Sequence, residues 1–227
     1  GGTAQNALNA ATYTLTASES VTGKSALGYV TTYSAGTLTV HKKDVTLASI
    51  TASNKTYDGN DTASITSGNI TTGVGTETLL ISGTGTFSNK NAAGGKTVTV
   101  SDVTALTKTD GTGDWDNYNL TTTGAMTTTA NIAKKDVALM SITAANKAYD
   151  GNTNATVTLS SADVLTGDAI SYGFTTASFA SNSVEANKSV AITNISLAGG
   201  DAQNYRLQNL MATATADITA ASNSNSG

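Results

Sequence analysis

A 20-residue stretch occurs twice in the chain, and this repetition constrains the fold more than any other feature of the sequence. KKDVTLASITASNKTYDGND at 42–61 aligns with KKDVALMSITAANKAYDGNT at 134–153, and 15 of the 20 positions are identical. Two weaker pairs follow in the same order: KTVTVSDV at 96–103 with KSVAITNI at 188–195, and GDWDNYNL at 113–120 with GDAQNYRL at 200–207. The offset falls from 92 (134 − 42) to 87 (200 − 113), so the second copy is five residues shorter.

This long period predicts whole small domains, because the repeats of solenoid proteins are much shorter. We expect one domain at 42–133, a second at 134–220 and a flexible polar tail at 221–227. Residues 1–41 are interpreted as the tail of a preceding repeat or as an accessory β element. The junction TTTANIAKKDVALMSI contains no Gly and no Pro. It predicts a last strand that continues into the next domain, and hence an elongated tandem with little hinge bending.

Residue types and their alternation predict a mainly β fold with few or no helices. Thr- and Val-rich runs such as TVTV at 97–100 alternate polar and apolar residues, as strands with one buried face do. Asn, Asp and Gly cluster between these runs and favour turns. Only SSADVLTGD at 160–168 suggests one helical turn, capped by Ser160 or Ser161. The pattern is compatible with a two-sheet sandwich and with a β-grasp-like sheet.

Charge and residue content argue against several classes of function. The net charge of −4 does not favour nucleic-acid binding, which requires clustered Lys and Arg. The absence of Cys from the sequence excludes a disulfide scaffold and a thiol nucleophile. No apolar run is long enough to insert into a membrane. Motifs such as G-x-S-x-G and H-E-x-x-H are missing, so we expect neither enzymatic activity nor a cofactor.

The repeated Tyr-Asp-Gly is interpreted as a structural corner. Asp-Gly between two strand-like runs favours a hairpin, because Gly adopts positive φ and Asp binds the local backbone. Each tyrosine ring is expected to cover a thin core. The later NYxL tyrosines are expected to begin a return strand, with the hydroxyl bonded to a loop. An exposed Tyr-Asp pair that binds a sugar is the alternative. The predicted structural residues are Tyr57, Asp58, Gly59, Tyr149, Asp150, Gly151, Tyr118 and Tyr205.

The stretch TDGTGDWDN at 109–117 suggests a metal site or a ligand site. Ca²⁺ prefers hard oxygen ligands at close spacing, and this stretch supplies Asp110, Asp114, Asp116 and Asn117. A solvated turn is the alternative, since the loop lacks a downstream bidentate Glu. Trp115 is the only Trp of the chain. It is interpreted either as an exposed ring that stacks on a glycan or as a lid on a small core.

The order of KKDV, NKxYDGN, a Lys-containing strand and GDxxNYxL in each copy resembles the YDG repeats of large bacterial filamentous-haemagglutinin-like adhesins. The resemblance covers residues 42 to about 220. It implies a non-enzymatic stalk or spacer of an exported adhesin, secreted or held at the outer-membrane surface of a Gram-negative bacterium.

The resemblance also implies how such a segment meets its partners. The full-length adhesin would bind a host or bacterial surface glycan or protein, in cell adhesion or biofilm formation. The segment itself is expected to be monomeric, without nucleic-acid binding or membrane insertion. A glycan- or protein-binding module centred on Trp115 and its acidic loop is the alternative function.

Overall fold

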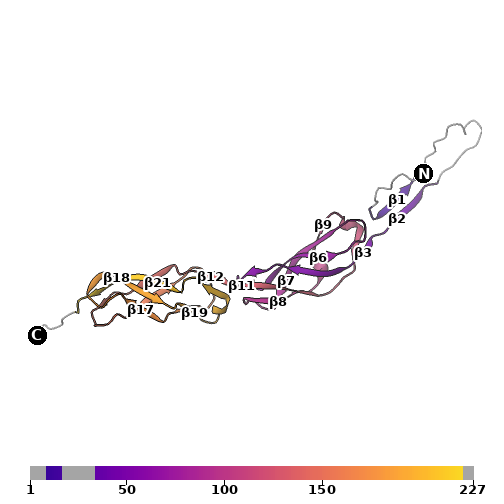
Figure 1. The fold of residues 1–227 in the computed structure, drawn as a ribbon. Helices are drawn as coiled ribbons and strands as arrows, with labels where there is room; N and C mark the ends of the chain where they lie inside the picture. The colour runs from indigo at the N-terminus through magenta and orange to yellow at the C-terminus, as the bar shows by residue number, and fades with distance from the viewer. Residues whose placement is uncertain (1–8, 17–33, 222–227) are drawn as a thin grey trace, which may run out of the picture. The chain divides into compact units, whose positions relative to one another are not determined.

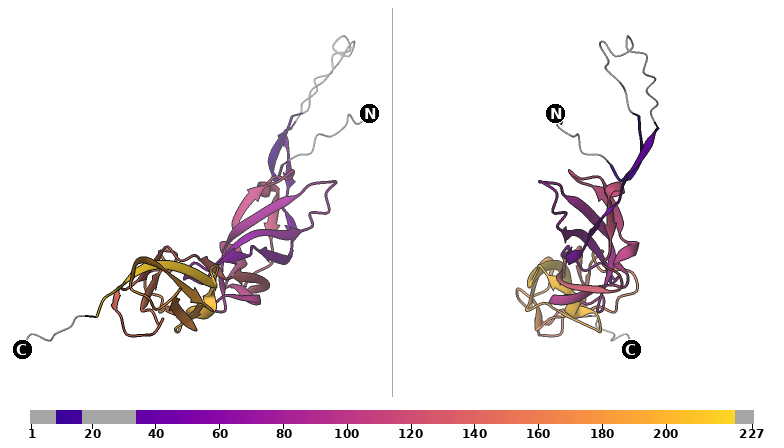
Figure 2. Two further views of the ribbon diagram at one scale, coloured as in Figure 1. Left: turned by 60° about the vertical axis from the view of Figure 1, so that its left-hand side comes forward. Right: turned by 90° about the vertical axis from the view of Figure 1, so that its right-hand side faces the viewer.

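The computed structural model of the chain describes residues 9–16 and 34–221, and these residues form a mainly β protein (Figures 1 and 2). Their helical segments are the short 3-10 turns η2 Val103–Ala105, η3 Trp115–Asn117 and η4 Ala202–Asn204. The predicted fold class is therefore confirmed. No helix in the described part is long and apolar enough to cross a membrane.

The helical turn suggested for residues 160–168 is not present. Ser160 ends a strand, and the residues that follow form bends and turns. Ser161 Oγ accepts a hydrogen bond from Asp163 N at 3.1 Å, so the serine stabilises a local turn without starting a helix. Ser and Asp favour both outcomes, which is why the sequence pattern did not separate them.

The chain forms two compact units. Unit 1 comprises residues 1–52, 64–85 and 98–128, and unit 2 comprises residues 53–63, 86–97 and 129–227. The first sequence copy contributes to both units, because its Tyr-Asp-Gly corner and the segment 86–97 belong to unit 2. Residues 1–8 and 17–33 of the N-terminal segment, and the predicted tail from residue 222 onward, lie outside the described residues.

Unit 1 is built from short strand pairs. Strand β1 Ala11–Leu15 pairs antiparallel with β2 Gly36–Val40, and β3 Lys43–Val45 pairs parallel with β10 Tyr118–Leu120. Strand β4 Leu47–Ala52 pairs antiparallel with β6 Thr62–Ile70, and β7 Leu79–Phe87 with β9 Thr107–Asp110. The first sequence copy as a whole forms a larger sheet of the order β4-β6-β7-β8-β11-β5, where β5 is Lys55–Thr56, β8 is Ala93–Val100 and β11 is Met126–Ala133.

Unit 2 repeats these pairings with the strands of the second copy. Strand β12 Lys135–Val137 pairs with β20 Tyr205–Leu207 as β3 does with β10, and β13 Ser141–Ala144 pairs with β15 Val157–Ser160 as β4 does with β6. Strand β16 Ser171–Gly173 pairs with β19 Ser196–Ala198 as β7 does with β9. A four-stranded sheet has the order β14 Lys147–Ala148, β21 Met211–Thr219, β18 Glu185–Thr193 and β17 Thr176–Phe179 (Figure 1). The two sequence copies therefore share one topology.

Strand β18 shows how the predicted alternation builds the core of unit 2. Val190 and Ile192 are buried, and the residues next to them on the strand are exposed or half-buried. They pack with the other buried residues of one core cluster: Phe179, Ile195, Ala216 and Ile218. The buried row begins at Lys188, a charged residue that a search for apolar alternation does not include.

The Tyr-Asp-Gly corner is not a hairpin, contrary to the prediction from sequence. The strands before it, β5 and β14, pair parallel with β11 and β21. The strands after it, β6 and β15, pair with β4 and β13. The corner therefore leads the chain from one strand pair to another. The positive φ that the sequence predicts for the corner glycine is nevertheless present, since Gly59 has a φ of 82° and Gly151 a φ of 83°.

Alanine at either corner glycine is expected to destabilise the fold. Gly59→Ala or Gly151→Ala should lower the free energy of unfolding by about 1–2 kcal/mol, because a Cβ is strained at positive φ. Gly200 is the control, since its φ lies outside that region and no described atom would lie within 4 Å of an added Cβ. Gly200→Ala should change stability by less than about 0.5 kcal/mol. Urea denaturation measures all three, and equal losses would contradict the assignment.

Candidate functional site

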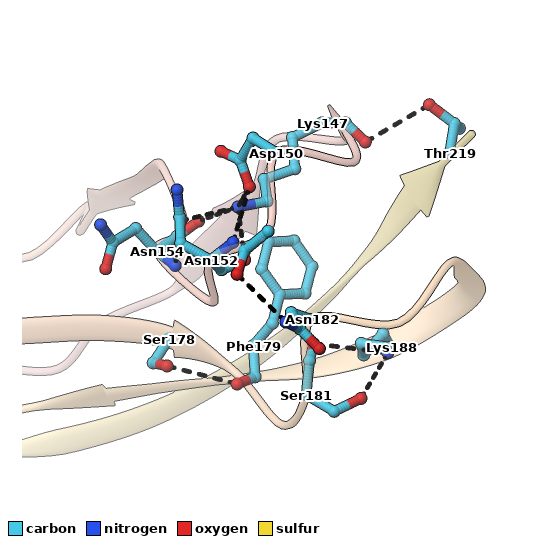
Figure 3. Close-up of polar contacts among 11 residues, drawn as sticks. Lys147, Asp150, Asn152, Asn154, Ser178, Phe179, Ser181, Asn182, Lys188 and Thr219 are labelled. Atoms are coloured by element: carbon cyan, nitrogen blue, oxygen red, sulfur yellow. Dashed lines mark hydrogen bonds and ion pairs between the residues drawn. The ribbon is translucent and has the colours of Figure 1, made fainter. Parts of the chain in front are cut away.

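The Tyr-Asp-Gly corner of the second copy closes around the ammonium group of Lys147 (Figure 3). Lys147 Nζ donates to Asp150 Oδ1 at 2.7 Å, to Asn152 O and Oδ1 at 2.9 Å, and to Asn154 O at 3.1 Å. Asp150 Oδ1 also accepts from Asn152 N at 3.1 Å, and Asn152 Oδ1 accepts from Asn154 N at 2.9 Å. One cation thus joins side chains and backbone of the whole turn.

The first copy has the same arrangement around Lys55. Its Nζ donates to Asp58 Oδ1, Asn60 O and Asn60 Oδ1, each at 2.8 Å. Asp58 Oδ1 accepts from Asn60 N at 3.2 Å, and Asn60 Oδ1 from Thr62 N at 3.0 Å. We call Lys55, Asp58 and Asn60 the first lysine corner, and Lys147, Asp150 and Asn152 the second. The motif NKxYDGN therefore encodes a lysine-centred turn.

A buried phenylalanine lies beneath each lysine corner. Lys147 Nζ lies 5.7 Å from the ring centroid of Phe179, and Lys55 Nζ lies 5.6 Å from that of Phe87. These distances are within the range in which a cation is attracted by the negative face of an aromatic ring. The two phenylalanines are separated by the repeat offset of 92 residues (179 − 87). Sequence reasoning named neither the lysines nor the phenylalanines, although their recurrence was visible in the alignment.

The lysines hold the corner aspartates in the charged form. The hydrogen bond from Lys147 and the amide of Asn152 lower the pKa of Asp150 below its ordinary value. At Asp58, burial works in the opposite direction, but the hydrogen bonds from Lys55 and Asn60 still bring the pKa below that value. A depressed pKa means that these contacts stabilise the fold at neutral pH and are lost only in strong acid.

A buried lysine, Lys188, lies beside the second lysine corner (Figure 3). Lys188 Nζ donates at 2.7 Å to Ser181 Oγ, Ser183 O and Ser183 Oγ, and lies 3.3 Å from Glu185 Oε2. Only 3% of its side chain is exposed. Asn182 Nδ2, from the same loop, donates to Gly151 O at 3.0 Å and connects this lysine to the corner.

The tyrosine of the first corner lies in a polar pocket of unit 2. Tyr57 is 2% exposed, and its hydroxyl donates to Asp168 Oδ2 at 2.9 Å. Tyr205 OH donates to the same oxygen at 2.6 Å. The two rings meet edge to face, with centroids 5.5 Å apart and an interplanar angle of 76°. We call Asp168 and Tyr205 the tyrosine socket.

Further contacts hold the socket in place. Lys90 Nζ lies 3.5 Å from Asp168 Oδ1 and 5.9 Å from the centroid of the Tyr57 ring. Leu165 N donates to Tyr205 OH at 3.0 Å. The neighbouring Asn204 is fully buried, and its Oδ1 accepts from Ala92 N at 2.9 Å. The Tyr57 side chain is therefore held by its hydrogen bond to Asp168 and by ring contacts with Tyr205 and Lys90. The ion pair and the backbone amides hold the residues around it.

The socket shifts the pKa of its three titratable partners. Burial and the hydrogen bond to Asp168 raise the pKa of Tyr57, and the same causes raise that of Tyr205 to about 12. At Asp168, burial opposes ionisation, but hydrogen bonds from Tyr205 and Tyr57 lower the pKa below its ordinary value. At neutral pH the socket therefore holds one carboxylate and two neutral phenols.

These shifts predict a loss of stability in strong base. A folded pKa of about 12 for Tyr205, above the ordinary value of about 10, gives stabilisation that is complete below about pH 10 and is lost as the pH rises toward 12. Ultraviolet absorbance titration of the phenols measures this transition. Tyr205→Phe should remove one phenol that titrates near pH 12, and an unchanged curve would contradict the assignment.

Tyr149, the counterpart of Tyr57, is not covered. Its backbone is placed alike, because Tyr149 N donates to Thr219 O at 2.8 Å and Tyr57 N to Ala133 O at 2.8 Å. Its side chain, however, is 44% exposed. The prediction that this ring covers a thin core is therefore wrong. The cover over Tyr57 comes from residues far away in the sequence, and the local motif carries no information about them.

Tyr118 and Tyr205 begin the equivalent strands β10 and β20. Tyr118 is buried, and its hydroxyl donates to Glu77 Oε2, as that of Tyr205 does to Asp168. Burial and the hydrogen bond to Glu77 raise the pKa of Tyr118. Each copy therefore pairs its NYxL tyrosine with a loop carboxylate.

Trp115 is a buried lid and not an exposed stacking surface. It is 9% exposed, and its Nε1 donates to Leu80 O and Thr109 O, both at 3.0 Å. Lys108 Nζ lies 5.3 Å from its ring centroid. Because its ring and its N–H both contact the protein, this residue does not present the flat face that a sugar would need.

Two of the proposed calcium ligands, Asp110 and Asp114, accept hydrogen bonds from backbone amides of their own loop. Asp110 Oδ1 accepts from Trp115 N and Asp114 Oδ1 from Asp116 N, both at 2.8 Å, and the second bond caps η3. Asn117 Oδ1 accepts from Ala10 N at 2.6 Å. In the described part of the chain, no group of three His, Cys, Asp or Glu residues is placed to hold a metal ion.

Comparison with known proteins agrees with the repeat found in the sequence. A family model described as the YDG domain matches residues 41–128 and 133–216. Comparisons with curated proteins and with solved structures gave no match.

Proposed function

Because the chain belongs to the YDG domain family, we propose that it is a structural spacer of an exported bacterial surface adhesin. The order of its motifs, which resembles that of filamentous-haemagglutinin-like adhesins, supports this assignment. We place it outside a Gram-negative cell, secreted or at the cell surface. There the full-length adhesin would bind a surface glycan or protein through another region. The spacer itself acts without catalysis and without a cofactor.

One observation carries the spacer role: the polar groups of the repeated motif are used in contacts within the protein. The ammonium group of Lys147 lies within hydrogen-bond distance of four oxygens of its own corner, which belong to Asp150, Asn152 and Asn154. Tyr57 is buried against Asp168 and Tyr205. Groups that are satisfied internally stabilise a fold, whereas recognition of a ligand needs groups that remain available to it.

The environment of Trp115 does not support the alternative that this chain is a glycan-binding module. Its ring is buried and its N–H is bonded to two backbone carbonyls. Stacking on a sugar would require this side chain to leave its place. Glycan binding through Trp115 would appear in the experiment below as a loss of attachment in Trp115→Ala.

A domain-exchange experiment in the cell-anchored protein that carries this chain tests the spacer role. Residues 42–219 would be replaced by an unrelated folded β protein of similar length, and attachment of the cells would be measured at equal surface display. A spacer predicts that the unrelated domain preserves attachment, and that Trp115→Ala at equal display changes nothing. Attachment that survives only with the native repeats, or that Trp115→Ala abolishes, would contradict the proposal.

A further inference from the structure

The exposed Tyr149 corner has the features of an unfilled docking surface. We infer that Tyr149 and the second lysine corner bind the tyrosine socket of another YDG repeat, that is, a buried Tyr paired with a loop carboxylate. Such a contact goes beyond the spacer role and does not depend on whether the protein is an adhesin.

The chain contains an example of the proposed contact. In unit 2, the ring of Tyr57 lies edge to face on Tyr205, and both hydroxyls donate to Asp168 Oδ2. The strand β12 that follows Ala133 pairs with β20, which begins at Tyr205. A YDG corner, the strand end beside it and the socket of a following repeat therefore form one contact.

The Tyr149 corner matches the Tyr57 corner in its local hydrogen bonds and backbone conformation. The lysine network and the positive φ of the glycine recur, as does the hydrogen bond from the tyrosine amide to a strand end. Thr219 occupies the place of Ala133. Only the cover differs, and it leaves 44% of Tyr149 exposed against 2% of Tyr57. A rigid corner that holds a large, half-exposed aromatic side chain is a suitable anchor for an interface.

The first copy carries its own socket, which shows that the socket recurs. Tyr118 is paired with Glu77 as Tyr205 is with Asp168. Asn117 Oδ1 accepts from Ala10 N, as Asn204 Oδ1 accepts from Ala92 N. A cavity of about 380 Å³ lies beside this pair, lined by residues that include His41, Glu77 and Tyr118. Each YDG repeat therefore has both a corner that can insert and a socket that can receive.

A fusion tests the inference directly. Residues 134–219 would be appended after Thr219, so that Lys134 of the appended copy follows Thr219 as it follows Ala133 in the chain. The appended copy would carry Tyr149→Phe, so that the original Tyr149 is read out alone. Nitration of each tyrosine by tetranitromethane would be followed by mass spectrometry of peptides. In the original chain Tyr149 should react and Tyr57 should be protected. In the fusion the rate at Tyr149 should fall by about tenfold or more, because reaction then requires local opening.

A matched fusion identifies the socket as the cause. In it, the appended copy alone carries the substitutions Asp168→Ala and Tyr205→Ala, and Tyr149 should react again at its original rate. Protection that persists without the socket would overturn the inference. So would a reactive Tyr149 beside an appended copy whose own Tyr205 is protected.

A second fusion guards against an appended repeat that does not fold. Residues 42–133 would follow Thr219, which supplies the socket made by Tyr118 and Glu77. If the appended copy of 134–219 does not fold, protection of Tyr149 in this second fusion supports the inference, and a reactive Tyr149 beside a folded appended copy of 42–133 overturns it. An unfolded appended repeat would leave its own Tyr118 or Tyr205 as reactive as in urea. If neither appended repeat folds by this criterion, the inference also fails, because a surface that binds the next repeat should support its folding.

Discussion

Replacing Tyr57 by alanine is expected to lower the free energy of unfolding by about 3–5 kcal/mol, the usual cost of truncating a buried aromatic side chain. Tyr57 is 2% exposed, contacts the ring of Tyr205 and donates to Asp168. The substitution removes these contacts and leaves the carboxylate with one fewer donor. Tyr149 occupies the same motif position and is 44% exposed. Tyr149→Ala should therefore change stability by less than about 0.5 kcal/mol.

Urea denaturation followed by far-ultraviolet circular dichroism measures both variants against the original chain. The comparison is internally matched, because the two tyrosines share sequence context, turn conformation and lysine network. Similar losses in the two variants would show that the motif tyrosine acts through its own turn. That result would exclude the socket as the main source of its stabilisation.

Lys188→Met is expected to lower the free energy of unfolding by about 2–4 kcal/mol, because it removes the charge-assisted hydrogen bonds of a buried ammonium group. The ammonium group of Lys188 donates to oxygens of Ser181 and Ser183, and the side chain is 3% exposed. Methionine keeps the length and most of the apolar contacts of the lysine stem. The loss therefore reports the ammonium group rather than the volume.

Lys134→Met supplies the control for this substitution. Lys134 is exposed, and the same change of chemistry there should alter stability by less than about 0.5 kcal/mol. Thermal and urea denaturation would be compared at low and moderate salt. The loss of stability in Lys188→Met should be similar at both, because ions screen a buried contact little. A Lys188→Met variant as stable as the control would show that the buried ammonium contributes nothing.

The sequence predicted those parts of the fold that depend on local pattern. Alternation in KSVAIT predicted a strand with one buried face, and β18 buries Val190 and Ile192 on that face. Repetition predicted one architecture used twice, and β3 with β10 pairs as β12 does with β20. The glycines of the two corners predicted positive φ, which Gly59 and Gly151 adopt. Each of these features is determined either by a few neighbouring residues or by the similarity of the two sequence copies.

Features decided by distant contacts were not accessible to this reasoning. Asp-Gly signals a turn, but it does not specify which strands pair, so β5 pairs with β11 and not with the strand after the corner. The exposure of Tyr149 depends on a cover that its own motif does not encode. Lys55 and Lys147 were overlooked because a lysine between strands is usually exposed. Their invariance across the two copies was the signal that could have identified them.

The acidic loop illustrates the limit of motif chemistry. Asp110 and Asp114 are the residue types that Ca²⁺ prefers, yet each binds a backbone amide of its own loop. Short polar side chains satisfy local backbone donors as readily as they bind metals. Trp115 could be read as a lid or as a stacking surface, and the carbonyls of Leu80 and Thr109 that accept from its Nε1 identify the lid.

The most direct test of the account is a double-mutant cycle between Tyr57→Phe and Asp168→Asn, with Tyr149→Phe and Asp168→Asn as the parallel cycle. The hydroxyl of Tyr57 donates to Asp168 Oδ2 at 2.9 Å, and this hydrogen bond fixes the first YDG corner on the tyrosine socket. This contact predicts a coupling energy of about 1–2 kcal/mol in the first cycle and additivity within about 0.5 kcal/mol in the second. Additivity in both cycles would contradict the account.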